Sequence, residues 1–393
     1  MMKKVMILGA GIYQVPLIKK EKEMGLHTIV VSIPGNYPGF EIADEICYED
    51  TTDAEKILQV AQEKQIDGIV TAGTDVAVIT IGRVCDALGL KGLSKEAAQI
   101  ASNKMQMKEA YEANDVRTAK FRYTKLNSDD VKEKASQLRF PLIFKAVDSS
   151  GSRGIIRVDS EDEFDKALQV VKDVTKKDYF IIEEFIEGEE FGAQAFVYNG
   201  ELQFIMPHGD YVFKGNTGVP IGHWAPYELS DSVIDDAKEQ LKKAVKAMKL
   251  DNCAINADFI MADGKTYVLE LGGRAGATCL AEMVSLYYGY DYYEKILRAC
   301  LGENIDFPTK QANPNAAMLL MSDVTGTIQS ITNSNVENEH IYQIQYDYQE
   351  GDSVRKFAVG PDRIGHVIVT EDTVSAAKEL VEEVSGNICV EVR

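Results

Sequence analysis

Residues 253–276 read CAINADFIMADGKTYVLELGGRAG, with two apolar runs on either side of the turn Ala262-Asp263-Gly264. The pattern predicts two successive strands, and their antiparallel pairing places Asp258 and Glu270 on one face of the sheet. Both acids have apolar neighbours, and a carboxylate within so apolar a strand needs a partner. Two converging carboxylates indicate a site for a hard cation such as Mg²⁺, although a pair of solvated surface acids has the same pattern.

Arg274 follows Glu270 in a turn rich in glycine, where a ligand is able to approach the backbone. A guanidinium at this point neutralises a transferring phosphoryl group or holds a carboxylate by two parallel hydrogen bonds. The alternative is a loop arginine that pairs with a nearby acid.

Upstream, residues 145–154 read KAVDSSGSRG, so Lys145 ends a strand over 140–145 and a small, flexible loop precedes another strand over 155–158. Serine and glycine allow several backbone N–H groups to converge on phosphate oxygens, while the lysine supplies a charge. The order of lysine and glycines excludes a Walker A loop. An ordinary hairpin turn with a solvated lysine is the alternative.

Residues 181–190 read IIEEFIEGEE, an apolar strand that runs into an acidic turn. A free strand edge reads adenine through backbone groups, and a carboxylate accepts the ribose hydroxyls. A solvated acidic turn is the alternative. The whole middle of the chain has an α+β pattern, with a charged helix over 94–114, a hairpin turn at Asn199-Gly200 and a long helix over 230–248.

The N-terminal segment predicts a doubly wound parallel sheet, because strands over 3–8, 27–32 and 68–72 alternate with helices. Gly9 and Gly11 form a partial dinucleotide fingerprint without its third glycine. The second strand also ends without the acidic residue that holds a ribose, which disfavours NAD. A tight turn that holds part of a small substrate is preferred.

Composition limits the partners. The 393 residues carry a net charge of −20, which opposes nucleic acid and anionic membrane surfaces. Six scattered cysteines show no zinc-ligand spacing, and no run is apolar and long enough to span a membrane. We therefore expect a cytoplasmic, multidomain enzyme or regulator.

Taken together and in this order, these segments resemble the ATP-grasp superfamily over roughly residues 1–305. The resemblance implies ATP and Mg²⁺ (or Mn²⁺) as ligands, with Asp258 and Glu270 holding the metal and Lys104 and Lys145 gripping the phosphates. It implies that Arg274 and Lys145 act in catalysis. The remaining nucleotide contacts that it implies are a phosphate loop (Ser149, Ser150, Gly151, Ser152, Gly154), an adenine hinge (Glu183, Glu184, Phe185, Ile186) and a ribose ligand (Glu190).

One departure from the family pattern is Gly272, which stands where the asparagine that supplies a third metal ligand is usual. The number of metal ions therefore stays open. The substrate side is predicted in a polar loop between the hairpin and the long helix, with His208, Asp210, Lys214 and His223, and at Gly9 and Gly11. A histidine there accepts the amine's proton or is structural.

The resemblance implies three parts: an α/β domain over 1–95, an ATP-grasp domain over 96–305 with a central subdomain near 115–190, and a small α+β tail over 306–393. The tail is similar to the end domains of amino-acid ligases, biotin carboxylases and formate-dependent glycinamide ribonucleotide formyltransferases, and does not choose among them.

The function implied is ligation of a small carboxylate to an amine through an acylphosphate, with a homodimer as one option for the assembly. The alternatives are a bicarbonate-using carboxylase or carbamoyl-phosphate-like enzyme, and a nucleotide-binding regulator without turnover.

Overall fold

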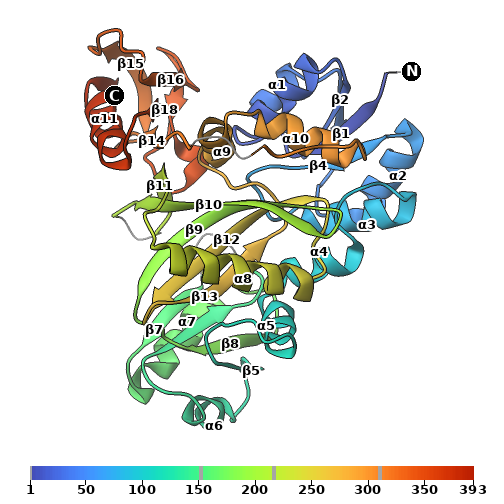
Figure 1. Cartoon of the computed structure of the whole chain (residues 1–393), viewed down its shortest axis with the longest axis vertical. Helices are drawn as coiled ribbons and strands as arrows, with labels where there is room; N and C mark the ends of the chain where they lie inside the picture. Colours follow the sequence, from blue (N-terminus) through green and yellow to red (C-terminus); the bar gives the residue numbers. More distant parts are fainter. Residues whose placement is uncertain (1, 150–153, 215–217, 309–311) are drawn as a thin grey trace.

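A computed structural model describes residues 2–149, 154–214, 218–308 and 312–393. A four-stranded parallel sheet and the C-terminal strands lie at one end of the molecule, and a small antiparallel sheet lies at the other (Figure 1). A large eight-stranded sheet extends from the middle of the molecule to the C-terminal strands, some of which belong to it. The mixed α/β and α+β class that the sequence predicts is confirmed.

The N-terminal sheet has the strand order β3-β2-β1-β4, and all its pairs are parallel. Its apolar strands are buried between helices, as the alternating pattern predicts. The strand β3 was not predicted, because its side chains alternate between half-buried and exposed and include polar residues. The elements are β1 (Lys4–Leu8), α1 (Val15–Glu23), β2 (His27–Ser32), η1 (Pro38–Glu41), β3 (Glu45–Tyr48), α2 (Ala54–Lys64), β4 (Gly68–Val70) and α3 (Val78–Leu88).

The single charged helix predicted over 94–114 is wrong, because two helices, α4 (Lys95–Ala101) and α5 (Lys104–Ala113), occupy this segment. The backbone of Asn103 is extended, and its side chain accepts hydrogen bonds from the N–H groups of Met105 and Gln106. Such a cap begins a new helix. Lys104 is therefore the first residue of α5.

The small antiparallel sheet has the order β5-β8-β6-β7, and α6 and α7 accompany it. The predicted hairpin around the Ser/Gly segment is confirmed, since Lys145 on β6 pairs with Ile155 on β7. The elements are β5 (Phe121–Lys125), α6 (Val131–Ser136), β6 (Leu142–Ala146), β7 (Ile155–Val158), η2 (Glu161–Glu163), α7 (Phe164–Lys172) and β8 (Tyr179–Glu184).

The large sheet has the order β13-β12-β9-β10-β11-β14-β18-β16 and is antiparallel throughout. The predicted turn at Asn199-Gly200 is confirmed, because both residues have positive φ (51° and 79°) between paired strands. The first strands are β9 (Glu189–Tyr198), β10 (Glu201–Val212), β11 (Pro220–Ala225), β12 (Cys253–Ala262) and β13 (Lys265–Gly272).

The polar loop predicted around His208 and His223 is wrong, because these residues lie on β10 and β11 within the sheet. The polar side chains of His208, Asp210 and His223 form hydrogen bonds with one another, so the strands carry these three groups with partners. The polarity of these strand residues therefore indicates a site that they line.

Each face of the large sheet has its own cover. The helix α8 (Asp231–Ala247) packs on the face that carries Ile255, and α9 (Leu280–Tyr288) and α10 (Tyr292–Cys300) pack on the face that carries Phe196. The second core continues into β1 and α1 of the N-terminal sheet. Phe196 on β9 pairs with Ala254 on β12, and Asp258 lies four residues after Ala254 on that strand. Residues at even spacing along a strand share a face, so Asp258 lies on the same face as Phe196, toward the N-terminal sheet.

The predicted C-terminal strands exist and extend the large sheet, because β11 pairs with β14. The prediction of a separate tail domain over 306–393 stays a prediction, as do the other domain limits. The last elements are β14 (Asn315–Leu320), β15 (Gly326–Asn333), β16 (Ile341–Tyr346), β17 (Ser353–Val354), η3 (Gly360–Asp362), β18 (Gly365–Thr370), α11 (Val374–Gly386) and β19 (Ile388–Val392), with a further sheet in the order β17-β15-β19.

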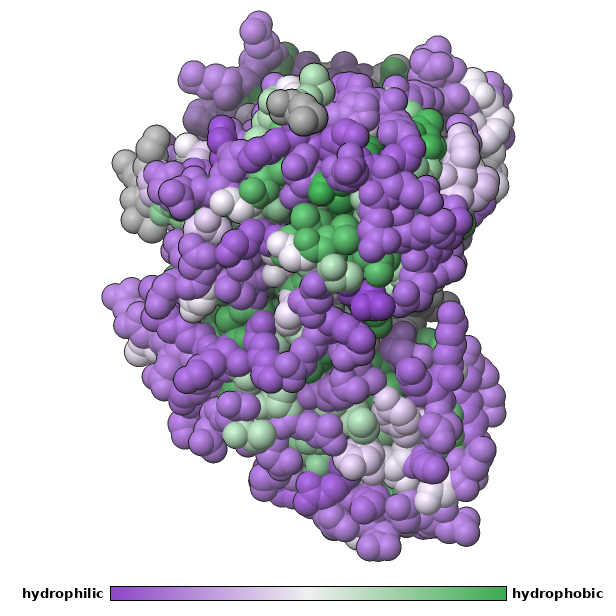
Figure 2. All heavy atoms as spheres, turned by 90° about the vertical axis from the view of Figure 1, so that its right-hand side faces the viewer, coloured by the Kyte–Doolittle hydropathy of each residue, from purple (hydrophilic) through white to green (hydrophobic). Residues whose placement is uncertain are grey.

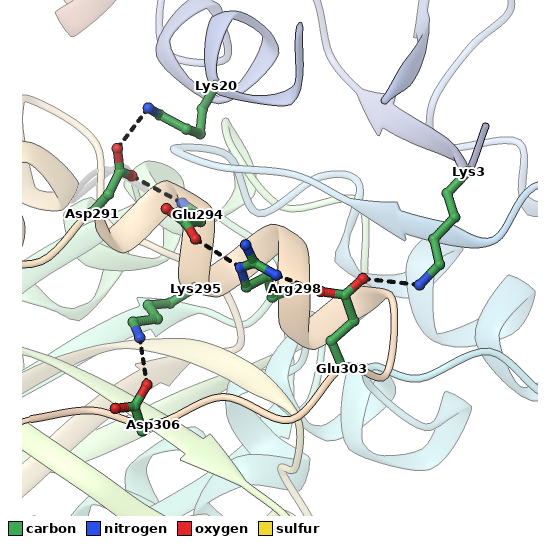
Figure 3. A network of polar contacts seen from close by, with 8 residues as sticks. All are labelled: Lys3, Lys20, Asp291, Glu294, Lys295, Arg298, Glu303 and Asp306. Atoms are coloured by element: carbon green, nitrogen blue, oxygen red, sulfur yellow. Dashed lines mark hydrogen bonds and ion pairs between the residues drawn. The ribbon is translucent and has the colours of Figure 1, made fainter. Parts of the chain in front are cut away.

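Ion pairs join the α10 region to the N-terminal sheet (Figure 3). Lys3 Nζ lies 2.9 Å from Glu303, and Lys20 Nζ lies 2.8 Å from Asp291. Arg298 bridges Glu294 and Glu303. Each partly exposed pair contributes at most about 1 kcal/mol, so the apolar contact between α1 and α10 carries most of this junction.

Among the described residues no helix is long and apolar enough to cross a membrane. The face shown in Figure 2 is mainly hydrophilic, and a group of apolar side chains is exposed near its middle.

Candidate active site

The carboxylates of Asp258 and Glu270 converge as the sequence predicts. Asp258 on β12 lies directly opposite Glu270 on β13, and a bulge follows immediately, before Phe259. The ammonium of Lys104 lies 2.5 Å from Glu270 Oε1, because the start of α5 points its first residue at the strand pair. A lysine and two acids from distant segments therefore share one site.

The surroundings of Asp258 strongly change the pKa of its carboxyl group. Desolvation at the base of the site, together with the charges of Glu270 and Asp210, raises the pKa of Asp258 to about 7. Its side chain still has solvent-accessible surface, so a ligand is able to reach it. A pair of acids that repel each other in an accessible place fits a divalent cation, whose charge would favour both ionised forms.

Glu183 on β8 lies between two lysines. Its carboxylate is 3.2 Å from Lys145 Nζ and 3.4 Å from Lys108 Nζ. Glu183 and Lys108 are buried, and Lys145 is largely buried. Burial alone would raise the pKa of Glu183, but the two ammonium groups hold it below its usual value. Burial, with the neighbouring Lys145, lowers the pKa of Lys108 to about 8 despite the attraction of Glu183.

Lys108 was missed by the sequence reasoning. It lies four residues after Lys104 on α5, a spacing that places both side chains on one face of a helix. Its ammonium also donates to Thr118 Oγ1, which donates to the carbonyl of Val268 at 2.6 Å. Lys108 thus connects Glu183 on the small sheet to β13 on the large sheet. The helical spacing from Lys104 is the sequence signal by which Lys108 could have been found.

The predicted adenine hinge connects the two antiparallel sheets. Glu184 ends β8, and its carboxylate accepts from Arg139 at 3.0 Å. The ring of Phe185 lies under the guanidinium of Arg157 at 4.5 Å from the ring centroid. Ile186 follows in the connection, and Glu190 is exposed on the first residues of β9. The hinge and the ribose ligand stay predictions.

The predicted phosphate loop is the segment that connects β6 to β7. The N–H of Ala146 donates to the carbonyl of Gly154 at 2.8 Å, and Gly154 has a φ of +70°. Ser149 has a buried hydroxyl for which the structure shows no hydrogen bond among the described residues. Ser150, Gly151 and Ser152 lie outside the described residues.

His208, Asp210 and His223 form a compact cluster on β10 and β11. The Nδ1 atoms of His208 and His223 lie 2.9 Å and 2.6 Å from the same oxygen of Asp210. Burial alone would raise the pKa of Asp210, but the two histidines hold it far below its usual value. Burial lowers the pKa of His223, against the attraction of Asp210. Lys214 is exposed beyond this cluster.

Gln194 determines the hydrogen positions in this cluster. The N–H of Gly276 donates to Gln194 Oε1 at 2.9 Å, so the amide NH₂ of Gln194 faces Asn256 Oδ1 at 2.6 Å and His208 Nε2 at 3.4 Å. Facing a donor, His208 Nε2 acts as the acceptor, and its hydrogen lies on Nδ1 toward Asp210. The three potential metal-ligand atoms lie within 4.8 Å of one another, but this arrangement of hydrogens favours a proton network.

Arg274 forms a bidentate ion pair with Asp75, a residue that the sequence reasoning missed. Nε and Nη2 of Arg274 lie 2.7 Å and 2.9 Å from the two oxygens of Asp75. The structure thus has the arrangement that the alternative interpretation of the sequence predicts, in which Arg274 pairs with a nearby acid. Asp75 follows β4 at the carboxyl edge of the parallel sheet, where such sheets bind their ligands. This position is the sequence signal by which Asp75 could have been found.

The turn at Gly9 and Gly11 follows β1 of the parallel sheet. Gly9 has a φ of +102°, and the N–H of Gly11 donates to Gln14 Oε1 at 3.0 Å. Gln14 in turn donates to the carbonyl of Ala72 at 2.5 Å. The turn is thus tied to the end of β4, and its substrate role stays a prediction.

Comparison with known proteins agrees with this geometry. A family model for the ATP-grasp domain matches residues 138–282, and a model for the L-amino acid ligase C-terminal domain 2 matches residues 318–393. The crystal structure of phosphoribosylglycinamide synthetase from Anaerococcus prevotii is 36% identical, with a TM-score of 0.88 over 100% of both chains.

Two curated relatives are more distant. The formate-dependent phosphoribosylglycinamide formyltransferase of Methanocella arvoryzae is 24% identical over 98% of this chain and 92% of its own length. The alanine–anticapsin ligase of Bacillus subtilis is 26% identical over 65% of this chain and 58% of its own length.

Two antiparallel sheets with lysines and acids between them define an ATP-grasp enzyme, and the chain belongs to the ATP-grasp family. It is a ligase that forms a carbon–nitrogen bond, and its family binds ATP.

Proposed function

We propose that this ligase activates a small carboxylate, of the amino-acid type, as an acylphosphate with ATP and Mg²⁺, and joins it to an amine. One observation carries the proposal: the acids Asp258 and Glu270 lie between lysines on one side, for which we propose phosphate binding, and the His208–Asp210–His223 cluster on the other.

A continuous row of paired residues across the large sheet supports this order. Glu270 pairs with Asp258, Asp258 pairs with Gly192, and Gly192 pairs with His208. A Cβ on Gly192 would lie 2.2 Å from the ring of His208, so the imidazole lies over the glycine. The row thus runs from the phosphate lysines to the histidines without a large side chain between them.

The lysines and the acids would serve the first step. Lys104 and Lys145 would bind phosphate oxygens of ATP, and Asp258 and Glu270 would hold Mg²⁺. When bound, Mg²⁺ supplies charge neutralisation at the phosphoryl group. An oxygen of the substrate carboxylate attacks the γ-phosphorus, the bond from that phosphorus to ADP breaks, and Arg274 and Lys145 offset the developing charge.

The histidine cluster would serve the second step. The amine nitrogen attacks the acyl carbon, the bond to phosphate breaks, and a proton leaves the nitrogen. His223 is the proposed proton acceptor, because its Nδ1–H faces Asp210 and its pKa is lowered, which keeps the ring neutral near pH 7. Among the described residues no hydrogen bond reaches its Nε2 atom.

The tail supports the amino-acid type of substrate, because the L-amino acid ligase model matches there. The relative from Methanocella arvoryzae is named as formate-dependent, and formate is also a small carboxylate. The test is phosphate release from ATP and Mg²⁺ with three panels: pairs of L-amino acids, formate with phosphoribosylglycinamide, and labelled bicarbonate with amines.

Phosphate release with an amino-acid pair, together with a ligated product in mass spectrometry, is expected. Label from bicarbonate in the product would contradict the proposal and favour a carboxylase. ATP binding without phosphate release in any panel would favour a regulator. Arg274→Ala should abolish release in whichever panel is active.

A further inference from the structure

The space above Gly272 contains an ion pair from two distant parts of the chain. A Cβ added to Gly272 would lie 3.3 Å from Asp75 Oδ1 and 3.8 Å from Arg274 Cζ. Asp75 and Arg274 are 199 positions apart in the sequence. A larger side chain at 272 would therefore press on the ion pair, and glycine leaves room for it.

Arg274 has more hydrogen-bond donors than partners among the described residues. Nε and Nη2 donate to the two oxygens of Asp75, and Nη1 donates to the carbonyl of Ala275 at 3.2 Å. A guanidinium has five N–H groups, so within the described part of the chain two remain for another ligand. They belong to Nη1 and Nη2, at the end of a side chain whose orientation Asp75 already determines.

The guanidinium of Arg274 also interacts with the charges of the two site acids. Burial alone would lower the pKa of Arg274, but the charge of Asp75, and after it the charges of Asp258 and Glu270, hold that pKa above its usual value. Burial alone would raise the pKa of Asp75, but Arg274 and Lys104 hold it below its usual value. Asp75 therefore stays ionised and keeps its hold on Arg274 at neutral pH.

Main-chain contacts place Asp75 beside Arg274. Ala72 forms a parallel bridge with Ala275, and the N–H of Gly73 donates to the carbonyl of Ala275 at 3.1 Å. The segment that carries Asp75 and the segment that carries Arg274 are thus joined by backbone hydrogen bonds. The position of the carboxylate is set by the docking of the N-terminal sheet.

We propose that Asp75 is a positioning residue that holds Arg274 so that its two free N–H groups bind the phosphate produced in the reaction. The inference rests on the proposed function and adds to it that the N-terminal sheet completes the phosphate site. A long, flexible arginine loses less freedom on binding an anion when a bidentate partner already orients it.

The test is the affinity for inorganic phosphate in the presence of saturating ADP and Mg²⁺, measured by calorimetry in the full-length protein. Asp75→Asn should weaken phosphate binding about tenfold and leave ADP binding within about twofold. Asp129→Asn, an exposed turn residue of the small sheet, serves as the matched control and should change neither value.

A double-mutant cycle separates positioning from a general structural effect. In an Arg274→Ala background, Asp75→Asn should cause no further loss of phosphate affinity. Full additivity of the two losses would overturn the inference, and so would unchanged or tighter phosphate binding by Asp75→Asn alone. Tighter binding is the result expected if Asp75 only competes with the anion.

This measurement needs neither the carboxylate nor the amine. If no substrate panel released phosphate, the proposed function would fail, while the effect of Asp75 on phosphate affinity would still be measured. Failure of the unmodified protein to bind phosphate with ADP and Mg²⁺ would overturn the positioning role itself.

Discussion

The ammonium of Lys104 lies 2.5 Å from Glu270 Oε1, across 166 positions of sequence. In this structure the lysine neutralises an acid that the proposed function assigns to Mg²⁺. Entry of nucleotide and metal would exchange partners, with Lys104 moving to a phosphate oxygen and Glu270 to the cation. Under the proposed function the same charged groups would also bind the nucleotide and the metal.

Glu270→Gln should abolish turnover, with a loss of at least about 10³-fold, because the amide removes one of the two charges proposed for the metal. Mn²⁺ binding, measured by calorimetry without substrates, should weaken in parallel. Glu239→Gln, at an exposed position of α8, is the matched control. Retention of most activity by Glu270→Gln would show that the metal assignment is wrong.

Lys145→Ala should weaken ATP binding about 10- to 100-fold, the value of one charge-assisted hydrogen bond to a phosphate. Direct ATP titration measures this loss. Lys132→Ala, which removes an exposed lysine of α6, should bind ATP normally. An unchanged ATP affinity in Lys145→Ala would mean that this lysine serves only Glu183.

Lys108→Met should lower the free energy of unfolding by about 1–3 kcal/mol, because Glu183 loses one of two buried cationic neighbours. Urea denaturation is the measurement, and the exposed Lys166→Met is the control. A stability equal to that of the control variant would count against a structural role for the buried lysine.

His223→Gln should reduce kcat by about 10²-fold or more and leave the KM for ATP almost unchanged, because the imidazole serves only the amine step. Steady-state kinetics with the active panel measures both constants. His340→Gln, on the segment before β16, is a control outside the site. A rise in the KM for ATP with an unchanged kcat would contradict proton transfer by His223.

Glu21 on α1 should make stability fall as pH rises. It has no exposed surface, and burial raises its pKa to about 9 from an ordinary value near 4.5. Between those two values the folded state holds a proton that the unfolded state has lost, so the free energy of unfolding decreases with increasing pH.

Relative to Glu21→Gln, the unmodified protein should lose about 1–3 kcal/mol between pH 6 and pH 8. Urea denaturation at the two pH values gives this difference. Glu23→Gln changes an exposed acid on the same helix and should keep the pH slope of the unmodified protein. An equal slope in Glu21→Gln would exclude Glu21 as its source.

The order of strands and helices was predictable wherever local signals were strong. The turn at Asn199-Gly200 and the pairing of Asp258 with Glu270 depend on turn chemistry and on alternation along a strand, which act over a few residues. The break at Asn103 was missed, because its cap lies inside a segment with continuous helical spacing.

The partners of the site residues were less predictable. His208 and His223 were placed in a loop, because polarity alone does not distinguish a solvated turn from a strand that lines a site. Lys108 and Asp75 were missed, since their partners Glu183 and Arg274 lie on other elements.

The sequence by itself determined most of the strands and the convergence of Asp258 and Glu270, because these follow from short-range spacing. Family resemblance implies which lysines belong to a phosphate site, and that assignment stays a prediction. Only the tertiary structure decided that Lys104 contacts Glu270, that Glu183 lies between two lysines and that Asp75 holds Arg274. These contacts join segments far apart in the chain, and their geometry depends on how the sheets dock rather than on local backbone preference.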